Sequence, residues 1–248
     1  MIQMDNVYKR LGGKQILTGT TLSILPGETR VIIGRSGEGK SVAIKHISGL
    51  MQPDDGAIYV DGEEISRNSE RDLLPVREKI GFLFQNAALF DSLNVLQNVG
   101  FSLYESRNYT DAEIRDQVAE TLRMVRLGDI MEKMPSELSG GMKKRVGLAR
   151  AIIKKPKIIL YDEPTTGLDP VTSDAINELI LSLSDQLKVT SVVITHDMTS
   201  AFKVATNFSM LFEGKIIFTG TKQELRKTDN PIVQQFIQGN SEGPLSNL

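Results

Sequence analysis

The sequence has no cysteine and no tryptophan, and only two of its 248 residues are histidine. Without cysteine there is no disulfide framework, thiol nucleophile or thiolate metal site, and two histidines leave little for a metal cage. No apolar run approaches the roughly 18 residues that a membrane-spanning helix needs, and the first residues, MIQMDNVYKR, lack the pattern of a signal peptide. The 29 basic and 31 acidic residues also lack the basic excess typical of nucleic-acid binding. Composition alone therefore predicts a soluble cytosolic domain that does not bind nucleic acid.

Short apolar runs of strand length alternate with longer segments of helical periodicity. In the first third of the chain, strands separated by turn residues are predicted at Ile2–Val7, Ile16–Ile24, Thr29–Ile33, Ala57–Val60 and Ile80–Phe84. The middle third is helical, and Thr110 caps a helix that runs to about Arg126. Strands and helices then alternate again, at Ile158–Tyr161, Pro170–Leu187, Ser191–Thr195, Met198–Ala205, Phe208–Phe212 and Lys215–Phe218. This alternation predicts an α/β fold, in which helices cover both faces of a parallel sheet, with a helical insert.

The strongest local pattern is a glycine-rich phosphate-binding motif, G-x-x-x-x-G-K-[ST]. It is formed by Gly34, Arg35, Ser36, Gly37, Glu38, Gly39, Lys40 and Ser41. The motif follows a predicted strand and precedes a predicted helix, Ser41–Ser48, which is the context that it requires. Glycine lets backbone N–H groups approach phosphate oxygens, and the helix N-terminus adds partial positive charge. Lys40 would neutralise phosphate charge and the Ser41 hydroxyl would bind Mg²⁺; the alternative is a glycine-rich turn with a chance lysine.

A second pattern is an apolar strand that ends in two carboxylates, Asp162 and Glu163. At the C-terminal end of a strand, Asp162 can hold Mg²⁺, directly or through water, and Glu163 can polarise an attacking water as a general base. Two acids after a strand are by themselves more typical of a solvated turn. The phosphate-binding motif in the same chain favours the catalytic interpretation.

A third pattern, Leu138-Ser139-Gly140-Gly141-Met142, precedes a basic amphipathic helix, Lys143–Lys155. A serine and two glycines at the start of a helix form another anion site, or no more than a capped helix. The chain thus has two candidate anion sites at helix N-termini, far apart in sequence, and the presence of both needs an explanation.

In this order and combination, the motifs resemble those of the nucleotide-binding subunits of ABC transporters, and the resemblance covers essentially the whole chain. The corresponding segments are Walker A at Gly34–Ser41, the Q-loop glutamine Gln85, the signature at Leu138–Met142, Walker B at Ile158–Glu163, the D-loop at Gly167–Asp169 and the switch histidine His196. The resemblance implies that Gln85 contacts Mg²⁺ and the attacking water, and that His196 contacts the γ-phosphate. On its residues alone, His196 is a strand-end histidine satisfied by a neighbour.

The same resemblance implies the fold and its domain boundaries. It predicts one P-loop ATPase (ABC ATPase) domain over residues 1–238, in which 1–85 and 157–238 form the core with an N-terminal antiparallel β subdomain. A helical subdomain insert with the signature spans about 86–156, and residues 239–248 form an extended tail. ATP and Mg²⁺ are the implied cofactors.

The resemblance also explains the two anion sites. It implies that Ser139 and Gly141 bind the γ-phosphate held by the opposite subunit, so the protein is predicted to form a head-to-tail homodimer that closes over two ATP molecules. The predicted nucleotide-binding residues are Gly34, Arg35, Ser36, Gly37, Glu38, Gly39, Lys40, Ser41, Val42, Ser139, Gly140, Gly141, Asp169 and Tyr8. The predicted metal ligands are Ser41, Gln85 and Asp162, and the predicted catalytic residues are Glu163, His196, Gln85 and Lys40.

A few positions depart from the family pattern. Met142 ends the signature where glutamine is usual, Tyr161 stands where an aliphatic residue or phenylalanine is common, and Val42 replaces a second hydroxyl residue. The aromatic residue that stacks on adenine aligns with Leu11, and Tyr8 is the only nearby substitute. We therefore expect weak recognition of the base.

Short segments resemble one branch of the family, the Mla-type ATPases of phospholipid transport. They are Phe82–Val95, Met134–Glu137, and Pro231–Gly239 with Gly243-Pro244. In the first segment, Leu89 and Phe90 form an apolar surface for a membrane permease, or ordinary core under the helical insert. The implied partners are membrane permease subunits and an MCE-type lipid-binding protein, and the implied location is the cytoplasmic face of the inner membrane, through the permease. The alternatives are an ATPase for small-solute import and a regulatory ABC protein without a transport role.

Overall fold

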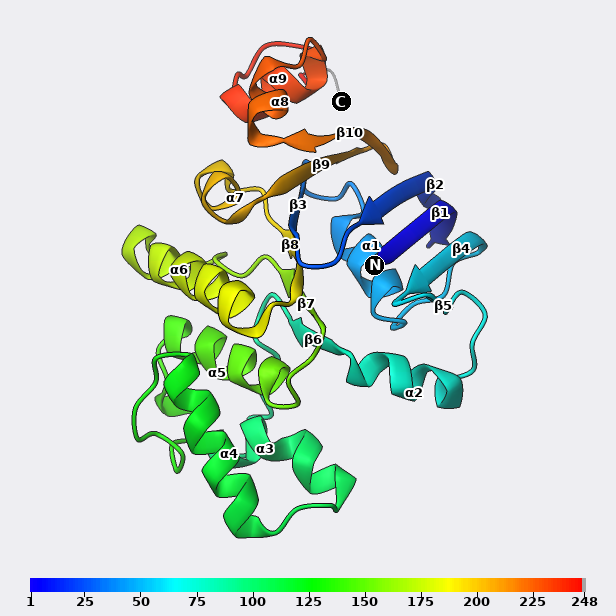
Figure 1. Ribbon diagram of the computed structural model, residues 1–248. Helices are drawn as coiled ribbons and strands as arrows, with labels where there is room; N and C mark the ends of the chain where they lie inside the picture. The colour runs from blue at the N-terminus through cyan, green and yellow to red at the C-terminus, as the bar shows by residue number, and fades with distance from the viewer. Residues whose placement is uncertain (247–248) are drawn as a thin grey trace. The chain divides into compact units, whose positions relative to one another are not determined.

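The computed structural model describes residues 1–246 (Figure 1). The chain divides into two compact units. Unit 1 consists of residues 1–73 and the chain from residue 192 onward, whereas unit 2 spans residues 74–191. The boundaries fall within helix α2 (Glu70–Glu78) and within strand β8 (Thr190–Ile194). The more detailed boundaries expected at 85/86 and 156/157 stay a prediction. Within residues 1–246, no helix is both long and apolar enough to cross a membrane.

Unit 1 contains an antiparallel sheet built from the N-terminal part of the chain. Its strand order is β2-β1-β4-β5, with bounds of Ile2–Leu11 for β1, Lys14–Ile24 for β2, Asp55–Val60 for β4 and Glu63–Glu64 for β5. Strands β1 and β2 form a hairpin through Gly12 and Gly13, both with positive φ. Ile2, Met4 and Val7 of β1 are fully buried, whereas Asp5 and Asn6, which lie between Met4 and Val7, are exposed. One face of this sheet therefore packs on the core of the unit.

A second set of strands in unit 1 leads to the phosphate-binding motif. Strand β3 (Thr29–Ile33) pairs in parallel with β9 (Asn207–Phe212), and β9 pairs antiparallel with β10 (Lys215–Thr221). Every residue of β3 is buried, as expected for a strand of a parallel sheet that is covered on both faces. Helix α1 (Lys40–Ile47) follows β3 after the glycine-rich loop.

Three short helices and a folded segment complete unit 1. The helices are α7 (Met198–Val204), α8 (Lys222–Lys227) and α9 (Pro231–Gln238). Residues 240–246 turn back on α9, because the Gln235 side chain donates to the Asn240 carbonyl (3.1 Å) and accepts from the Leu245 N–H (2.7 Å). The expected extended tail, 239–248, includes residues 247 and 248, which lie outside the described residues.

Unit 2 combines two parallel strands with a group of helices. Strand β6 (Ile80–Leu83) pairs in parallel with β7 (Ile158–Asp162). The helices are α3 (Val95–Ser106), α4 (Asp111–Met124), η1 (Pro135–Glu137), α5 (Gly140–Ile152) and α6 (Pro170–Leu187). Helix α3 packs against both α4 and α5, and Figure 1 shows these three helices in green as one group.

Local signals account for one of the predicted helices and for two of the helices that the sequence pattern missed. Thr110 caps α4 as predicted, with a capping box completed by Glu113. The sequence pattern missed α2, which carries Pro75 inside the helix, because an interior proline usually argues against a helix. It also missed α3, although Asn94 and Gln97 form a capping box at its start. That capping box is the signal that could have located α3.

Gly56 in β4 provides a test of the packing within the antiparallel sheet. It has a φ of 89°, and a Cβ at this position would lie 2.4 Å from the Asn6 carbonyl oxygen. Gly62 is the matched control, because its φ is 86° but a Cβ there would meet nothing within 4 Å. We expect Gly62→Ala to lower the free energy of unfolding by about 1 kcal/mol, the strain of a left-handed residue, and Gly56→Ala to lower it by about 2 kcal/mol more, owing to the clash. Urea unfolding measures both, and equal losses would contradict the close approach of Gly56 to Asn6.

Candidate functional site

The glycine-rich loop of unit 1 has a backbone that only glycine permits at two positions. Gly34 has a φ of 150°, and a Cβ on it would lie 2.4 Å from the Leu211 carbonyl oxygen of β9. Gly39 has a φ of 98°, and a Cβ there would lie 2.8 Å from Ile16 Cγ2 of β2. Any larger residue would displace the backbone, so the loop is held close to β2 and β9. The loop ends at the N-terminus of α1, where backbone N–H groups and the helix dipole favour an anion.

Lys40 carries the positive charge of this loop. Its side chain is only 6% exposed, and its ammonium donates to the carbonyl oxygens of Gly34 (2.7 Å) and Arg35 (2.8 Å). The loop backbone therefore surrounds the Lys40 ammonium. A phosphate group at the start of α1 would meet a cation that is already in position, with little loss of side-chain freedom on binding.

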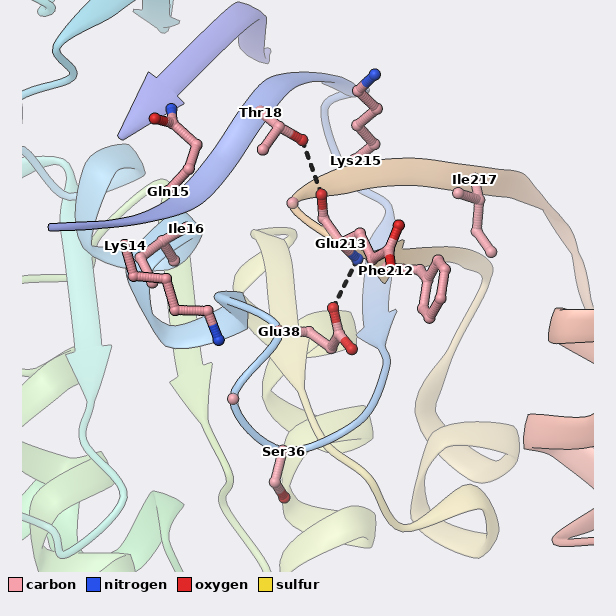
Figure 2. A pocket seen from close by; sticks show the side chains of 12 residues that line it. Lys14, Gln15, Ile16, Thr18, Ser36, Glu38, Phe212, Glu213, Lys215 and Ile217 are labelled. Carbon is pink, nitrogen blue, oxygen red and sulfur yellow. Dashed lines mark hydrogen bonds between the residues drawn. The ribbon is translucent and has the colours of Figure 1, made fainter. Parts of the chain in front are cut away.

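A cavity of about 700 Å³ lies beside the loop in unit 1 (Figure 2), a volume within the range of small-molecule sites. Its walls come from β2, from the glycine-rich loop and from the β9–β10 turn: Lys14, Gln15, Ile16, Thr18, Ser36, Gly37, Glu38, Phe212, Glu213, Gly214, Lys215 and Ile217. Glu38 accepts a hydrogen bond from the Glu213 N–H (2.6 Å), and Thr18 Oγ1 donates to the Glu213 carbonyl (2.7 Å), as Figure 2 shows. The first bond holds the loop, and the second holds β2, against the β9–β10 turn.

The predicted base contact, Tyr8, lies on the antiparallel sheet. Its hydroxyl approaches Gly19 of β2, where a Cβ would lie 3.0 Å from Tyr8 Oη. Leu11, at the position that aligns with the usual aromatic residue, is 38% exposed. A contact between Tyr8 and a base stays a prediction.

His196 leaves the same edge of the sheet in unit 1 as the glycine-rich loop. The Thr195 N–H donates to the Ile32 carbonyl of β3 (3.4 Å), so the chain following β8 emerges beside the end of β3. His196 is exposed. The residues on either side of His196 are held in place: the Asp197 N–H donates to Thr195 Oγ1 (3.0 Å), and Asp197 caps α7. A strand end thus presents this imidazole at the edge where the glycine-rich loop begins.

The two carboxylates of unit 2 lie at the end of β7. Asp162 is the last residue of the strand and is 6% exposed, and Glu163 is 8% exposed. Glu163 has a φ of 49°, a left-handed conformation that costs a non-glycine residue on the order of 1 kcal/mol. Thr166 Oγ1 donates to Glu163 Oε2 (3.0 Å) and orients the carboxylate. Backbone strain of this kind is typical of functional sites.

Gln85 leaves the neighbouring strand, β6, at the same edge of unit 2, because β6 and β7 run in parallel. Its backbone carbonyl accepts a hydrogen bond from Lys144 of α5, and the same ammonium donates to the Glu163 carbonyl (3.0 Å). Burial lowers the pKa of Lys144, and the Glu163 and Asp162 carboxylates oppose that shift. Lys144 was not predicted as a site residue, because its position within a basic helix suggests a solvated face.

The signature and the D-loop come together within unit 2. Ser139 is the N-cap of α5 and accepts from the Met142 N–H (3.3 Å). A Cβ on Gly141 would lie 2.6 Å from Thr172 Cγ2 of α6, so the two helices approach closely at their starts. Asp169, the N-cap of α6, accepts from the hydroxyl (2.5 Å) and the N–H (3.0 Å) of Thr172, and these hydrogen bonds lower its pKa. Ser139 itself is exposed at this junction.

Comparison with known proteins agrees with this geometry. The family model described as "ABC transporter" matches residues 17–166, which is more than half of the chain. The chain therefore belongs to the ABC transporter family.

Individual relatives and a solved structure are also similar to this chain. The chain is 41% identical to the "Probable ribonucleotide transport ATP-binding protein mkl" of Mycobacterium tuberculosis, over 98% of this chain and 68% of that protein. It is 37% identical to the "Intermembrane phospholipid transport system ATP-binding protein MlaF" of Haemophilus influenzae, over 99% of this chain and 93% of that protein. A dimeric post-hydrolysis structure of the ATP-binding cassette MJ0796 with ADP and Pi is similar at a TM-score of 0.82 and 33% identity, covering 89% of this chain and 98% of that one.

These findings confirm the expected fold class and the expected enzyme activity. The fold is the ABC ATPase P-loop fold, mixed α/β with an antiparallel β subdomain. The protein is an ABC ATPase that hydrolyses ATP to ADP and phosphate to drive transport.

Lys40 is the residue whose loss tests the phosphate site. We expect Lys40→Ala to weaken ATP binding at least about 100-fold, because a buried charge that binds an anion contributes on the order of 3 kcal/mol. Lys45→Ala, on the same helix, is the control and should bind like the wild type. Titration with a fluorescent ATP analogue measures both affinities. Unchanged affinity in Lys40→Ala would overturn the assignment of the loop.

Proposed function

We propose that this protein is the ATPase subunit of a phospholipid transporter and that it acts as a head-to-tail homodimer beneath a separate membrane permease. The observation that carries the dimer is the occurrence, in one chain, of two different half-sites. Unit 1 holds the glycine-rich loop with Lys40, and unit 2 presents the exposed Ser139 at the start of α5. Two copies related head to tail would supply each ATP with one half-site from each chain.

In the proposed site, residues of Walker A hold the phosphates. Backbone N–H groups of residues 34–42 and the Lys40 ammonium bind the phosphate oxygens, and Ser139, Gly140 and Gly141 of the opposite copy bind the γ-phosphate. The cavity beside the loop, between β2 and the β9–β10 turn, is where we place the nucleoside. Its lining carries Lys14 and Glu38 as polar groups, together with Ile16 as an apolar surface.

The proposed ligands of Mg²⁺ are the Ser41 hydroxyl, the Gln85 side-chain oxygen and the Asp162 carboxylate. All three are hard oxygen donors, as Mg²⁺ requires. The described residues hold no cluster of three or more His, Cys, Asp or Glu side chains that could bind a metal. This donor set fits Mg²⁺, which is bound by one or two carboxylates together with substrate phosphates and water. When bound, the ion neutralises charge on the phosphate oxygens.

Glu163 is the proposed general base, which accepts the proton of the water that attacks the γ-phosphate. Its left-handed backbone and its bond from Thr166 support a fixed orientation of the carboxylate. Gln85 is proposed to orient the same water, and His196 to contact the γ-phosphate. Asp169, rigidly held at the start of α6, is proposed to contribute to the site across the dimer.

An aromatic groove on unit 2 is the proposed permease-binding surface. It encloses about 720 Å³, and its lining includes Phe82, Phe84, Phe90, Phe101 and Arg150. Phe90 is 45% exposed, its ring centroid lies 4.9 Å from that of Phe101, and the Arg150 guanidinium lies 5.9 Å from its centroid. Exposed rings flanked by cations suit a helix that presents apolar side chains and acidic groups.

The cargo is proposed from resemblance. The MlaF relative is named for intermembrane phospholipid transport, and this chain covers 93% of it. An MCE-type lipid-binding protein is the further proposed partner, reached through the permease at the cytoplasmic face of the inner membrane. The second candidate cargo is a small solute, since the mkl relative is named for ribonucleotide transport. Stimulation of ATP hydrolysis by the co-purified permease in lipid-loaded nanodiscs, but not by added ribonucleotides, would favour the phospholipid.

Glu163→Gln tests both the base and the dimer. We expect turnover to fall about 10²- to 10⁴-fold, the usual contribution of a general base, while ATP still binds and holds two copies together. Single-turnover assays measure hydrolysis, and size-exclusion chromatography with light scattering measures the mass with ATP and Mg²⁺. Glu120→Gln, at an exposed position of α4, is the control. Full turnover would refute the base, and a monomer with bound ATP would refute the composite site.

Phe90→Asp tests the permease-binding surface. A charge in the aromatic groove should abolish recovery of the protein with the membrane fraction, because it would oppose burial of an apolar helix. Tyr109→Asp is the control, since Tyr109 is also exposed (43%) but is not among the described residues that line the groove. The melting temperature should change by no more than about 2 °C, as for other surface substitutions. Loss of the fold in Phe90→Asp would instead identify Phe90 as core.

A further inference from the structure

Lys144 is a buried cation that none of the family motifs accounts for. It lies in α5, five residues after Ser139, and is 5% exposed. Removing an ammonium group from water is costly unless hydrogen bonds replace the lost hydration. Its ammonium donates to two backbone carbonyls, that of Gln85 and that of Glu163 (3.0 Å). One side chain therefore connects the segment that follows β6 with the segment that follows β7.

Other residues of α5 also bind the segment that contains Gln85, residues 84–88, which is called the Gln85 segment below. Arg150 donates to the carbonyl oxygens of Ala87 and Ala88, at 2.7 Å each. Both alanines have left-handed φ values, 59° and 48°, which turn successive carbonyls toward the helix. A Cβ on Gly147 would lie 3.0 Å from Ala87 Cβ. The Gln85 segment thus contacts α5 at Lys144, Gly147 and Arg150, and we expect it to move with this helix.

Lys144 joins Glu163 to α5. The Glu163 backbone is left-handed, a strained conformation that persists only where surrounding contacts hold it. The Glu163 carbonyl accepts from the Lys144 ammonium (3.0 Å) and from the Thr166 N–H (3.3 Å), while the Thr166 hydroxyl donates to the carboxylate. A displacement of α5 or of the Gln85 segment would pass to Glu163 through the ammonium.

We propose that Lys144 is a positioning residue that links the Gln85 segment to Glu163, so that the general base is aligned only when the Gln85 segment is in place. The inference rests on the proposed roles of Gln85 and Glu163. Lys144 itself touches neither ATP nor water in this account. It acts through the two carbonyls, and a rigid α5 carries the signature serine in the same movement.

The test compares three variants of α5 in the full chain. Lys144→Met keeps the length of the side chain but donates no hydrogen bond, whereas Lys144→Arg keeps both the charge and several donors. Lys143→Met changes the neighbouring lysine, which is only half-buried, and is the control. We expect Lys144→Met to lower kcat about 10- to 100-fold, the effect of misplacing a catalytic group by about 1 Å, while KM and the ATP dissociation constant stay within about twofold. Lys144→Arg should keep kcat within about threefold of the wild type.

Hydrogen–deuterium exchange provides the readout that a loss of packing would not reproduce. In Lys144→Met, exchange should rise at residues 84–88 and at 163–166 together, while the backbone of α5 stays protected. If Lys144→Met does not fold, Lys144→Gln takes its place, because its shorter amide reaches one carbonyl but does not hold both. A kcat within twofold of the wild type, unchanged exchange at both segments, or an equal loss in the arginine variant overturns the link. Glu163→Gln, measured in parallel, separates the two proposals: full turnover in that variant refutes the base itself, whatever Lys144 does.

Discussion

A buried ammonium group held by two backbone carbonyls organises the site in each unit of this protein. In unit 1, Lys40 is tied to Gly34 and Arg35, and in unit 2, Lys144 is tied to Gln85 and Glu163. Each lysine is at most 6% exposed. A cation in this setting stabilises the backbone around it because the alternative, a desolvated charge without partners, is far more costly. The surrounding loops have the conformations that bring their carbonyls to the lysine.

Glycine at a few positions makes that arrangement possible. Gly34 and Gly39 allow the loop of unit 1 to pass within contact distance of β9 and β2, and Gly147 lets α5 approach the chain beyond β6. In unit 2, Gly141 brings the signature against the start of α6. In the proposed dimer, each unit contributes one half of an ATP site. Because each chain would carry one half-site of each kind, a head-to-tail pair of copies would complete both ATP sites without a further protein.

Residues whose role is local were predictable, and residues whose role depends on tertiary burial were not. The Walker A loop was located because its spacing encodes both the strand-to-helix turn and the chemistry. Asp162 and Glu163 could be proposed because an apolar strand ends in carboxylates, and their roles stay predictions. Lys144 was missed, since sequence periodicity does not show that a lysine in a basic helix is buried under two loops. The base contact stays a prediction: Tyr8 is the only aromatic substitute near Leu11, and its hydroxyl lies close to Gly19.

The central claim is that each ATP site is completed by a second copy of the chain. Complementation between two inactive variants tests it most directly. Lys40→Ala removes the Walker A half-site, and Ser139→Arg blocks the signature half-site, so neither variant alone should hydrolyse ATP. A mixture forms heterodimers in which one of the two sites has both halves intact, and the account predicts that ATP hydrolysis reappears on mixing. A mixture no more active than the separate variants would contradict the account.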